Sequence, residues 1–223
     1  MLVGRWIPES GCRSLPYNPG AHNPEGPIKF AVLASGSGTN FQALIDSADP
    51  AVEFSVLISD RQEAGALRRA DAAGIPTAVA EYSDYADREA FSTAIVAATR
   101  AAEAEALVLA GFMRILSPVA LDGFPDRIIN IHPSLLPAFP GARAVAQALA
   151  YGAKVTGVTV HFVDEEVDHG PIIAQRAVPI LDDDTVETLH ERIQIEEHKL
   201  YPEVISAFAR GRIEVIGREV IWT

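Results

Sequence analysis

An alternation of short apolar runs and longer helical patterns, beginning at residue 28, constrains the fold of this chain more than any other feature. Five runs are continuously apolar, which is typical of strands buried on both faces of a parallel sheet; they cover residues 28–34, 52–59, 75–80, 106–110 and 127–131. Segments with Ala, Leu and Arg at helical spacing lie between them, at residues 40–48, 64–73 and 84–102. This order predicts an α/β fold with a doubly wound, mostly parallel sheet and right-handed crossovers.

The pattern changes after residue 151. Residues 154–164 alternate Thr and Val as a half-exposed strand does, and residues 172–180 follow across a turn of sequence DHGP. We expect this pair to extend the sheet with antiparallel strands. A final strand is predicted over residues 212–222.

A long helix is predicted between these last strands. Asp184 opens it, and Glu187 three residues later has the spacing of a capping box. The pattern continues toward Arg210, and Pro202 predicts a kink or a break in the helix. No repeat or linker interrupts residues 28–223, which we therefore expect to form one domain.

Residues 1–27 differ from the rest of the chain. They hold five of the fifteen prolines and four of the sixteen glycines, which predicts a disordered or surface-draped arm. The arm lacks the apolar centre of a signal peptide, and no apolar run reaches the roughly 20 residues of a membrane span. Cys12 is the only cysteine, so an intrachain disulfide is excluded and a reducing, cytoplasmic setting is expected.

The net charge of −12 limits the kinds of partner. A protein that binds nucleic acid through phosphates needs a basic stripe, and the sequence contains none. We therefore expect small-molecule partners, with no nucleic acid and no membrane, and the sequence leaves a homodimer open. His190 and His198 are eight residues apart on the predicted helix, which is no usual ligand spacing, so no metal is expected.

A glycine-rich segment, SGSGTN at residues 35–40, separates the first predicted strand from the first helix. Small residues there let backbone N–H groups converge on an anion at the helix N-terminus. Phe41 stands where a dinucleotide fingerprint has its third glycine, and the lysine of a P-loop is absent. The pattern favours a phosphate site over a simple tight turn and disfavours NAD.

Polar side chains gather where the fifth predicted strand ends. Asn130 and His132 are two residues apart, so they project from one face at the ligand-binding end of the sheet. They could hold an oxyanion and move a proton, or simply pair with loop backbone groups. Asp168 could form an Asx-turn, or it could lie near His132 and raise its pKa above about 6.5. His161 is more typical of a buried strand histidine than of a catalyst.

An apolar segment of sequence GFMRIL follows the fourth predicted strand directly. Its bulky side chains could line a flat pocket at the ligand-binding end of the sheet, or belong to ordinary core. Ser117 and Pro118 after it have the pattern of an N-cap followed by proline at the first helical position.

Four motifs, SGSGTN, AGFMRILSP, NIHPSLLPAFPG and DHGP, occur in an order and spacing that resemble the phosphoribosylglycinamide formyltransferases over residues 28–211. The resemblance implies a Rossmann-like formyltransferase fold. It also implies transfer of a formyl group from 10-formyltetrahydrofolate to the amine of N1-(5-phospho-D-ribosyl)glycinamide (glycinamide ribonucleotide) in de novo purine (IMP) biosynthesis.

The resemblance also assigns roles to residues. The catalytic positions match Asn130, His132 and Asp168. The loop that holds the ribonucleotide phosphate matches Gly38, Thr39 and Asn40, and a glutamate near the glycinamide amine matches Glu197. The folate-binding positions match Arg88, Met113, Arg114, Ile115, Leu116 and Asn130.

Arg143 departs from the pattern, because family members commonly carry histidine there and arginine cannot act as a neutral base. Two related enzymes share these motifs. Formyltetrahydrofolate deformylase, which hydrolyses the same donor, carries an extra N-terminal regulatory domain, and methionyl-tRNA formyltransferase needs a C-terminal RNA-binding domain. A non-catalytic ligand-binding module would need a broken catalytic trio, whereas all three residues are present.

Overall fold

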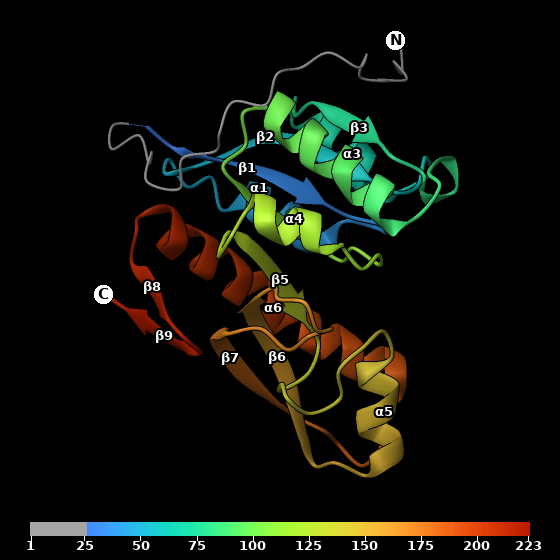
Figure 1. The fold of residues 1–223 in the computed structure, drawn as a ribbon. Helices are drawn as coiled ribbons and strands as arrows, with labels where there is room; N and C mark the ends of the chain where they lie inside the picture. Colours follow the sequence, from blue (N-terminus) through green and yellow to red (C-terminus); the bar gives the residue numbers. More distant parts are fainter. Residues whose placement is uncertain (1–25) are drawn as a thin grey trace.

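Seven strands form one sheet in the computed structural model, which describes residues 26–223. The predicted N-terminal arm therefore lies almost entirely outside the described residues. The order is β3-β2-β1-β4-β5-β6-β7 (Figure 1). Strands β1 to β5 are parallel to one another, and β6 is antiparallel to both of its neighbours, β5 and β7. The strands are β1 (Ile28–Leu33), β2 (Val52–Ser59), β3 (Thr77–Val79), β4 (Ala106–Leu109), β5 (Ile128–His132), β6 (Val155–Phe162) and β7 (Ile172–Pro179). The expected fold class is confirmed.

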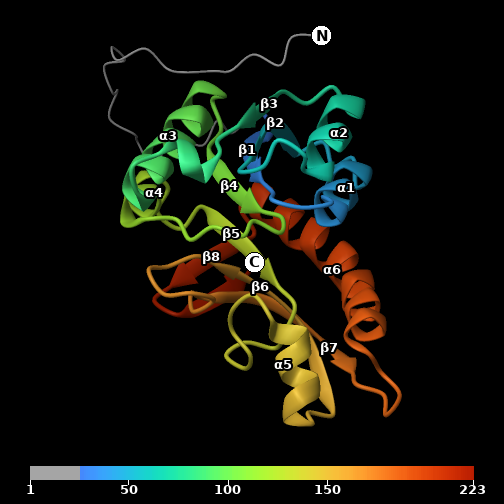
Figure 2. The same cartoon turned by 90° about the vertical axis from the view of Figure 1, so that its right-hand side faces the viewer.

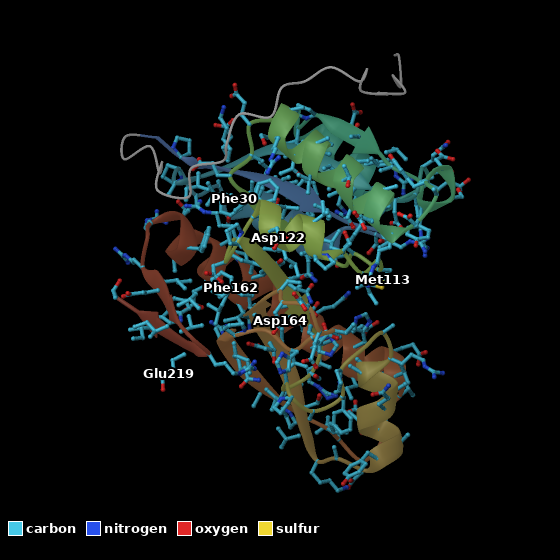
Figure 3. All side chains as sticks on the ribbon, in the orientation of Figure 1. Phe30, Met113, Asp122, Phe162, Asp164 and Glu219 are labelled. Carbon is cyan, nitrogen blue, oxygen red and sulfur yellow. The ribbon has the colours of Figure 1, made fainter. Side chains whose placement is uncertain are left out.

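Helices cover both faces of the sheet, which explains why the strands are continuously apolar. Phe30 and Val32 of β1 pack on one face with α1, α2 and α6, whereas Ala31 and Leu33 pack on the other with α3 and α4 (Figure 2). The helices are α1 (Thr39–Asp46), α2 (Gly65–Ala72), α3 (Arg88–Ala101), α4 (Pro118–Gly123), α5 (Ala144–Tyr151) and α6 (Val186–Ala209). Phe30 and Phe162, which belong to the core on the α1, α2 and α6 side of the sheet, are labelled in Figure 3.

Two helices begin later than expected. A 3-10 turn occupies Tyr82–Asp84, and α3 starts only after Asp87, whose side chain accepts a hydrogen bond from the Ala90 amide. In α6 the capping box is formed by Thr185 and Thr188, so the predicted box of Asp184 and Glu187 is wrong. Asp184 lies outside the helix, where it pairs with Arg192. Aspartate caps α3 and threonine caps α6 because each side chain reaches the amide three residues on.

Pro202 does not break α6, which continues to Ala209. Proline removes one backbone hydrogen bond. Tyr201, Val204 and Ile205 on both sides of it are completely or almost completely buried, and this burial favours the unbroken helix.

The predicted final strand is instead a hairpin of β8 (Ile213–Ile216) and β9 (Glu219–Trp222) that forms a separate two-stranded sheet. Gly217 has a φ of 63°. A two-residue turn with glycine at its first position is the geometry that reverses a strand, and Gly217 and Arg218 provide it.

Candidate active site

A cavity of about 390 Å³ opens at the carboxyl ends of β4 and β5. Three segments line it: the loop after β4, the end of β5 with the loop that follows, and the loop between β6 and β7. The lining side chains from these segments include Met113, Arg114, Ile115, Leu116, Asn130, His132, Asp164, Glu166, Val167 and Asp168, and His161 of β6 also lines the cavity. This is the edge of the sheet at which the sequence predicted a ligand site.

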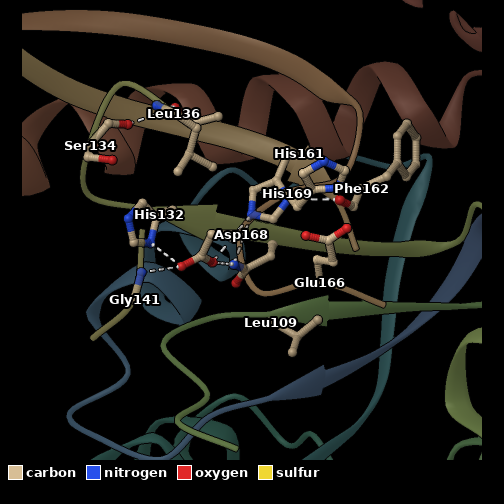
Figure 4. A network of polar contacts seen from close by, with 12 residues as sticks. Leu109, His132, Ser134, Leu136, Gly141, His161, Phe162, Glu166, Asp168 and His169 are labelled. Carbon is tan, nitrogen blue, oxygen red and sulfur yellow. Dashed lines mark hydrogen bonds and ion pairs between the residues drawn. The ribbon is translucent and has the colours of Figure 1, made fainter. Parts of the chain in front are cut away.

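The structure brings Asn130, His132 and Asp168 together at this cavity. Figure 4 shows the Asp168 carboxylate between the His132 ring and Gly141. Oδ2 of Asp168 lies 3.3 Å from Nδ1 of His132 and accepts a hydrogen bond of 2.7 Å from the Gly141 amide. Nδ2 of Asn130 lies 3.4 Å from Oδ1 of the same carboxylate. One carboxylate therefore orients both the imidazole and the amide.

Asp168 is held in an uncommon backbone conformation. Its φ of 53° lies in the left-handed region, which aspartate tolerates better than most residues. Two residues later, a Cβ added to Gly170 would lie 2.0 Å from the Phe162 carbonyl oxygen. The turn thus requires glycine at this position, and it aims the Asp168 carboxylate at His132 rather than at its own backbone.

Burial dominates the electrostatics of His132. Its side chain is 7% exposed, and desolvation lowers the pKa of His132 below its ordinary value although Asp168 and the Phe139 carbonyl favour the charged ring. The expected rise in this pKa is therefore wrong. Nε2 lies 2.9 Å from the Phe139 carbonyl oxygen, so both ring nitrogens face acceptors and only the imidazolium donates to both. His132 is thus mostly neutral near pH 7, with an acceptor already in place at each ring nitrogen.

Asn130 has a second partner that sequence reasoning missed. β5 and β6 pair so that Asn130 lies directly opposite His161, and Nδ2 of the amide is 3.1 Å from Nε2 of the ring. Nδ1 of His161 faces the Phe162 carbonyl oxygen at 2.7 Å, which assigns the proton to Nδ1 and makes Nε2 an acceptor. The strand histidine therefore holds the Asn130 amide in one orientation. The cross-strand register was the information needed to find it.

The loop after β5 is anchored from β6. Thr159 receives a hydrogen bond of 3.0 Å from the Leu136 amide and donates one of 2.7 Å to the Ser134 carbonyl oxygen. Gln175 on β7 donates to the Leu136 carbonyl oxygen at 2.9 Å. These bonds hold the segment that carries the Phe139 carbonyl against His132.

The loop after β4 forms the open wall of the cavity. Met113 and Ile115 are 60% and 53% exposed, and Met113 is labelled in Figure 3. Arg114 is held by Asp60, whose buried carboxylate lies 2.7 Å from Nε, and its guanidinium stacks 4.9 Å from the ring centroid of Tyr82. Arg114 therefore directs its charge away from the apolar wall, toward a second cavity of about 570 Å³ that it also lines.

The glycine loop meets α6 at a second group of predicted site residues. Gly38 has a φ of 76°, and an added Cβ would lie 2.7 Å from Cα of Ala66, so only glycine fits. Nδ2 of Asn40 donates to Oε2 of Glu197 at 3.0 Å. Glu197 is 4% exposed, and burial raises its pKa. The Met113 amide donates to Ser35 Oγ at 2.8 Å, which joins this loop to the cavity wall.

The arrangement has counterparts among known proteins. Residues 28–205 match the model of the family described as Formyl transferase. This chain belongs to the formyl transferase family. It is 47% identical over 197 residues to the phosphoribosylglycinamide formyltransferase of Mycobacterium tuberculosis, covering 87% of this chain and 91% of the relative. It is also 47% identical over 180 residues to the enzyme of that name from Bacillus subtilis, covering 79% and 92%.

A solved structure agrees with this assignment. The formyl transferase chain matches the crystal structure of glycinamide ribonucleotide transformylase 1 from Symbiobacterium toebii with a TM-score of 0.86 and 48% identity, covering 88% of this chain and 94% of that one. The family resemblance of the four motifs is thereby confirmed.

Two arginines of this formyl transferase lie apart from the cavity. Arg88 is the first residue of α3 and is exposed, and Arg143 is exposed at the N-cap of α5. Neither is among the residues that line the cavity, although Gly141 and Ala142 next to Arg143 are. Within residues 26–223, no group of three or more His, Cys, Asp or Glu side chains could hold a metal ion.

Proposed function

We propose that this formyl transferase moves the formyl group of 10-formyltetrahydrofolate to the amine of glycinamide ribonucleotide, a step of purine biosynthesis. The observation that carries the proposal is the convergence of Asn130, His132 and Asp168 on a cavity with an apolar wall. The names of the relatives support the same activity. Direct transfer needs no covalent enzyme intermediate.

The reaction begins when the amine nitrogen attacks the formyl carbon. A C–N bond forms, and the electron pair of the C=O bond moves to oxygen, which gives a tetrahedral centre. The attacking nitrogen must then lose a proton, and the folate nitrogen must gain one before its bond to carbon breaks. The products are the formylated amide and tetrahydrofolate.

His132 is the group that carries this proton. Its pKa is lowered by burial, so the ring is neutral near pH 7 and accepts the amine proton. The resulting imidazolium lies 3.3 Å from the Asp168 carboxylate, which stabilises it until the proton passes to the folate nitrogen. Nε2 of His132 lies 2.9 Å from the Phe139 carbonyl oxygen. The substrate amine must therefore compete with this oxygen for the ring nitrogen.

Asn130 and the imidazolium stabilise the oxyanion. One hydrogen of the Asn130 amide is directed at His161, at 3.1 Å, and the other makes a longer contact of 3.4 Å with Asp168. The longer contact is the weaker one, so that hydrogen is the one available to the developing charge. Because the amide is already oriented by His161, little reorganisation is needed when the charge forms.

The two substrates occupy the two ends of the site. We place the folate ring system against Met113, Arg114, Ile115 and Leu116, with Arg88 as the proposed contact for its anionic tail. The phosphate of the ribonucleotide lies at the loop of Gly38, Thr39 and Asn40, where backbone N–H groups favour an anion. Glu197 faces the glycinamide amine from α6. Since the net charge is −12, these local groups, and not the overall field, must attract two anionic substrates.

An absorbance assay of tetrahydrofolate release tests the proposal. Purified protein is given 10-formyltetrahydrofolate with and without glycinamide ribonucleotide, and release is expected only with the ribonucleotide. Release at the same rate without it would mean hydrolysis, as in a deformylase, and would refute the transferase function. Binding of the donor without turnover in either arm would indicate a ligand-binding module.

The setting of the enzyme completes the proposal. We expect one formyltransferase domain over residues 28–223, in the cytoplasm, with small molecules as its ligands and no nucleic acid. No helix within residues 26–223 is long and apolar enough to cross a membrane. Sedimentation of the purified chain decides between a monomer and a homodimer.

A further inference from the structure

The C-terminal hairpin contacts the loop that carries Asp168, and it lies outside residues 28–205, which match the family model. Figure 2 shows β8 beside the segment between β6 and β7. Nη2 of Arg218 donates to the His169 carbonyl oxygen at 2.7 Å, and Nε1 of Trp222 donates to the Ile173 carbonyl oxygen at 3.0 Å. These two bonds fix the chain on either side of the Gly170–Pro171 turn.

The same loop is held internally by His169. Nδ1 of its ring lies 2.7 Å from Oδ2 of Asp164, and Oδ1 of Asp164 accepts from the Glu166 amide at 3.1 Å. Nη1 of Arg218 lies 3.4 Å from both ring nitrogens of His169. Arg218 thus contacts the backbone and the ring of the residue directly after Asp168, and that ring is paired with the start of the loop.

The conformation of Asp168 explains why this loop needs an external anchor. A non-glycine residue at a φ of 53° is strained, and such a conformation persists only where the surroundings impose it. If the loop relaxed, Oδ2 would leave the Gly141 amide and the His132 ring, from which it now lies 2.7 and 3.3 Å. Arg218 binds the carbonyl oxygen of His169, which directly follows Asp168 in the sequence. A backbone shift at His169 would therefore move the Asp168 carboxylate as well.

We propose that the C-terminal hairpin positions the catalytic carboxylate, with Arg218 as its positioning residue. The inference rests on the proposed function of Asp168. Arg218 does not line the cavity and acts on the reaction only through the loop.

Arg218→Ala is the test, with Arg212→Ala as its matched control. Both arginines are exposed residues of the C-terminal segment, so both variants change the charge equally. We expect Arg218→Ala to lower kcat about tenfold with KM for both substrates unchanged, because the lost interaction positions a group that acts in the transition state. Arg212→Ala should retain the wild-type kcat, and Arg218→Lys should recover part of the loss. An equal loss in the two alanine variants would overturn the proposal.

A double-mutant cycle separates positioning from general destabilisation. In an Asp168→Asn background, Arg218→Ala should lower kcat no further, because residues that act as one unit are not additive. The same tenfold loss in that background would show that Arg218 acts elsewhere.

Hydrogen exchange gives a readout that does not depend on activity. Amides of residues 164–170 should exchange faster in Arg218→Ala than in Arg212→Ala and in the wild type. Unchanged exchange would refute the anchoring role. Faster exchange in a protein without transferase activity would instead refute the proposed function and leave the anchor standing.

Discussion

Asp168→Asn is the substitution that separates charge from shape in the active site. The carboxylate uses both oxygens as acceptors: Oδ2 for the Gly141 amide at 2.7 Å and Oδ1 for the Asn130 amide at 3.4 Å. An asparagine has one acceptor oxygen. If that oxygen keeps the Gly141 bond, the new NH2 group faces the NH2 group of Asn130, and the opposite orientation places it against the Gly141 N–H.

The size of the effect follows from the distance to His132. Two unit charges 3.3 Å apart attract by about 5 kcal/mol at an effective dielectric constant of about 20. The polar amide of asparagine recovers part of this stabilisation of the imidazolium. Since about 1.4 kcal/mol corresponds to a tenfold change in rate, we expect kcat to fall by about 10²- to 10³-fold.

The assay is the release of tetrahydrofolate at saturating concentrations of both substrates, with KM measured for each. KM should change by no more than about twofold, because the charge acts mainly in the transition state. Asp182→Asn is the control, since this carboxylate is 95% exposed and forms only a surface pair with Lys154. A kcat within threefold of wild type for Asp168→Asn would refute the role of its charge.

Four further predictions follow from the same contacts. His132→Ala should lower kcat about 10²- to 10⁴-fold while folate still binds, measured by fluorescence titration, because the proton carrier is lost. Burial lowers the pKa of His132, so activity should fall at acidic pH with a midpoint below the ordinary histidine pKa of about 6.5. That midpoint should move to still lower pH in Asp168→Asn, and a shift to higher pH would contradict the pairing. Burial raises the pKa of Glu197, so the charged form of this carboxylate destabilises the fold at pH values above that pKa. Glu197→Gln should therefore raise Tm at pH 8 but not at pH 4. The same variant should raise KM for the ribonucleotide and leave KM for the folate unchanged. Tyr201→Phe removes a buried hydroxyl that lies 3.0 Å from the carbonyl oxygens of residues 109 and 129 and should lower the free energy of unfolding by about 1–2 kcal/mol in urea titrations, whereas Tyr151→Phe, at an 82% exposed position, should not.

Most of the sheet could be predicted because a strand that is buried on both faces has a continuously apolar sequence. The first two and the fourth and fifth apolar runs coincide with β1, β2, β4 and β5 to within one residue at either end. β3 is shorter than expected, since only Thr77–Val79 pairs with β2. The hairpin of β8 and β9 was missed because the pattern of residues 212–222 is apolar on both sides of a single glycine, which a continuous strand also tolerates.

The candidate site was predictable in its composition but not in its energetics. Asn130, His132 and Asp168 are recognisable from their motifs, and the structure places them together. The pKa of His132 was predicted in the wrong direction, because a sequence reveals a neighbouring carboxylate more readily than the extent of burial. His161 was underestimated for a similar reason: its contact with Asn130 depends on which residues of β5 and β6 lie opposite each other.

Helix α6 links the two ends of the active site through its own periodicity. Glu197 faces Asn40 at the glycine loop, and Tyr201, one turn later, contacts the carbonyl oxygens of β4 and β5. A single residue inserted between them would rotate Glu197 by about 100° and shift it by about 1.5 Å relative to Tyr201. The carboxylate would then lose the loop while the tyrosine kept the strands. The four-residue spacing on α6 therefore sets the position of the glycine loop relative to the carboxyl ends of β4 and β5, and a change of length in this turn of the helix would break one of the two contacts.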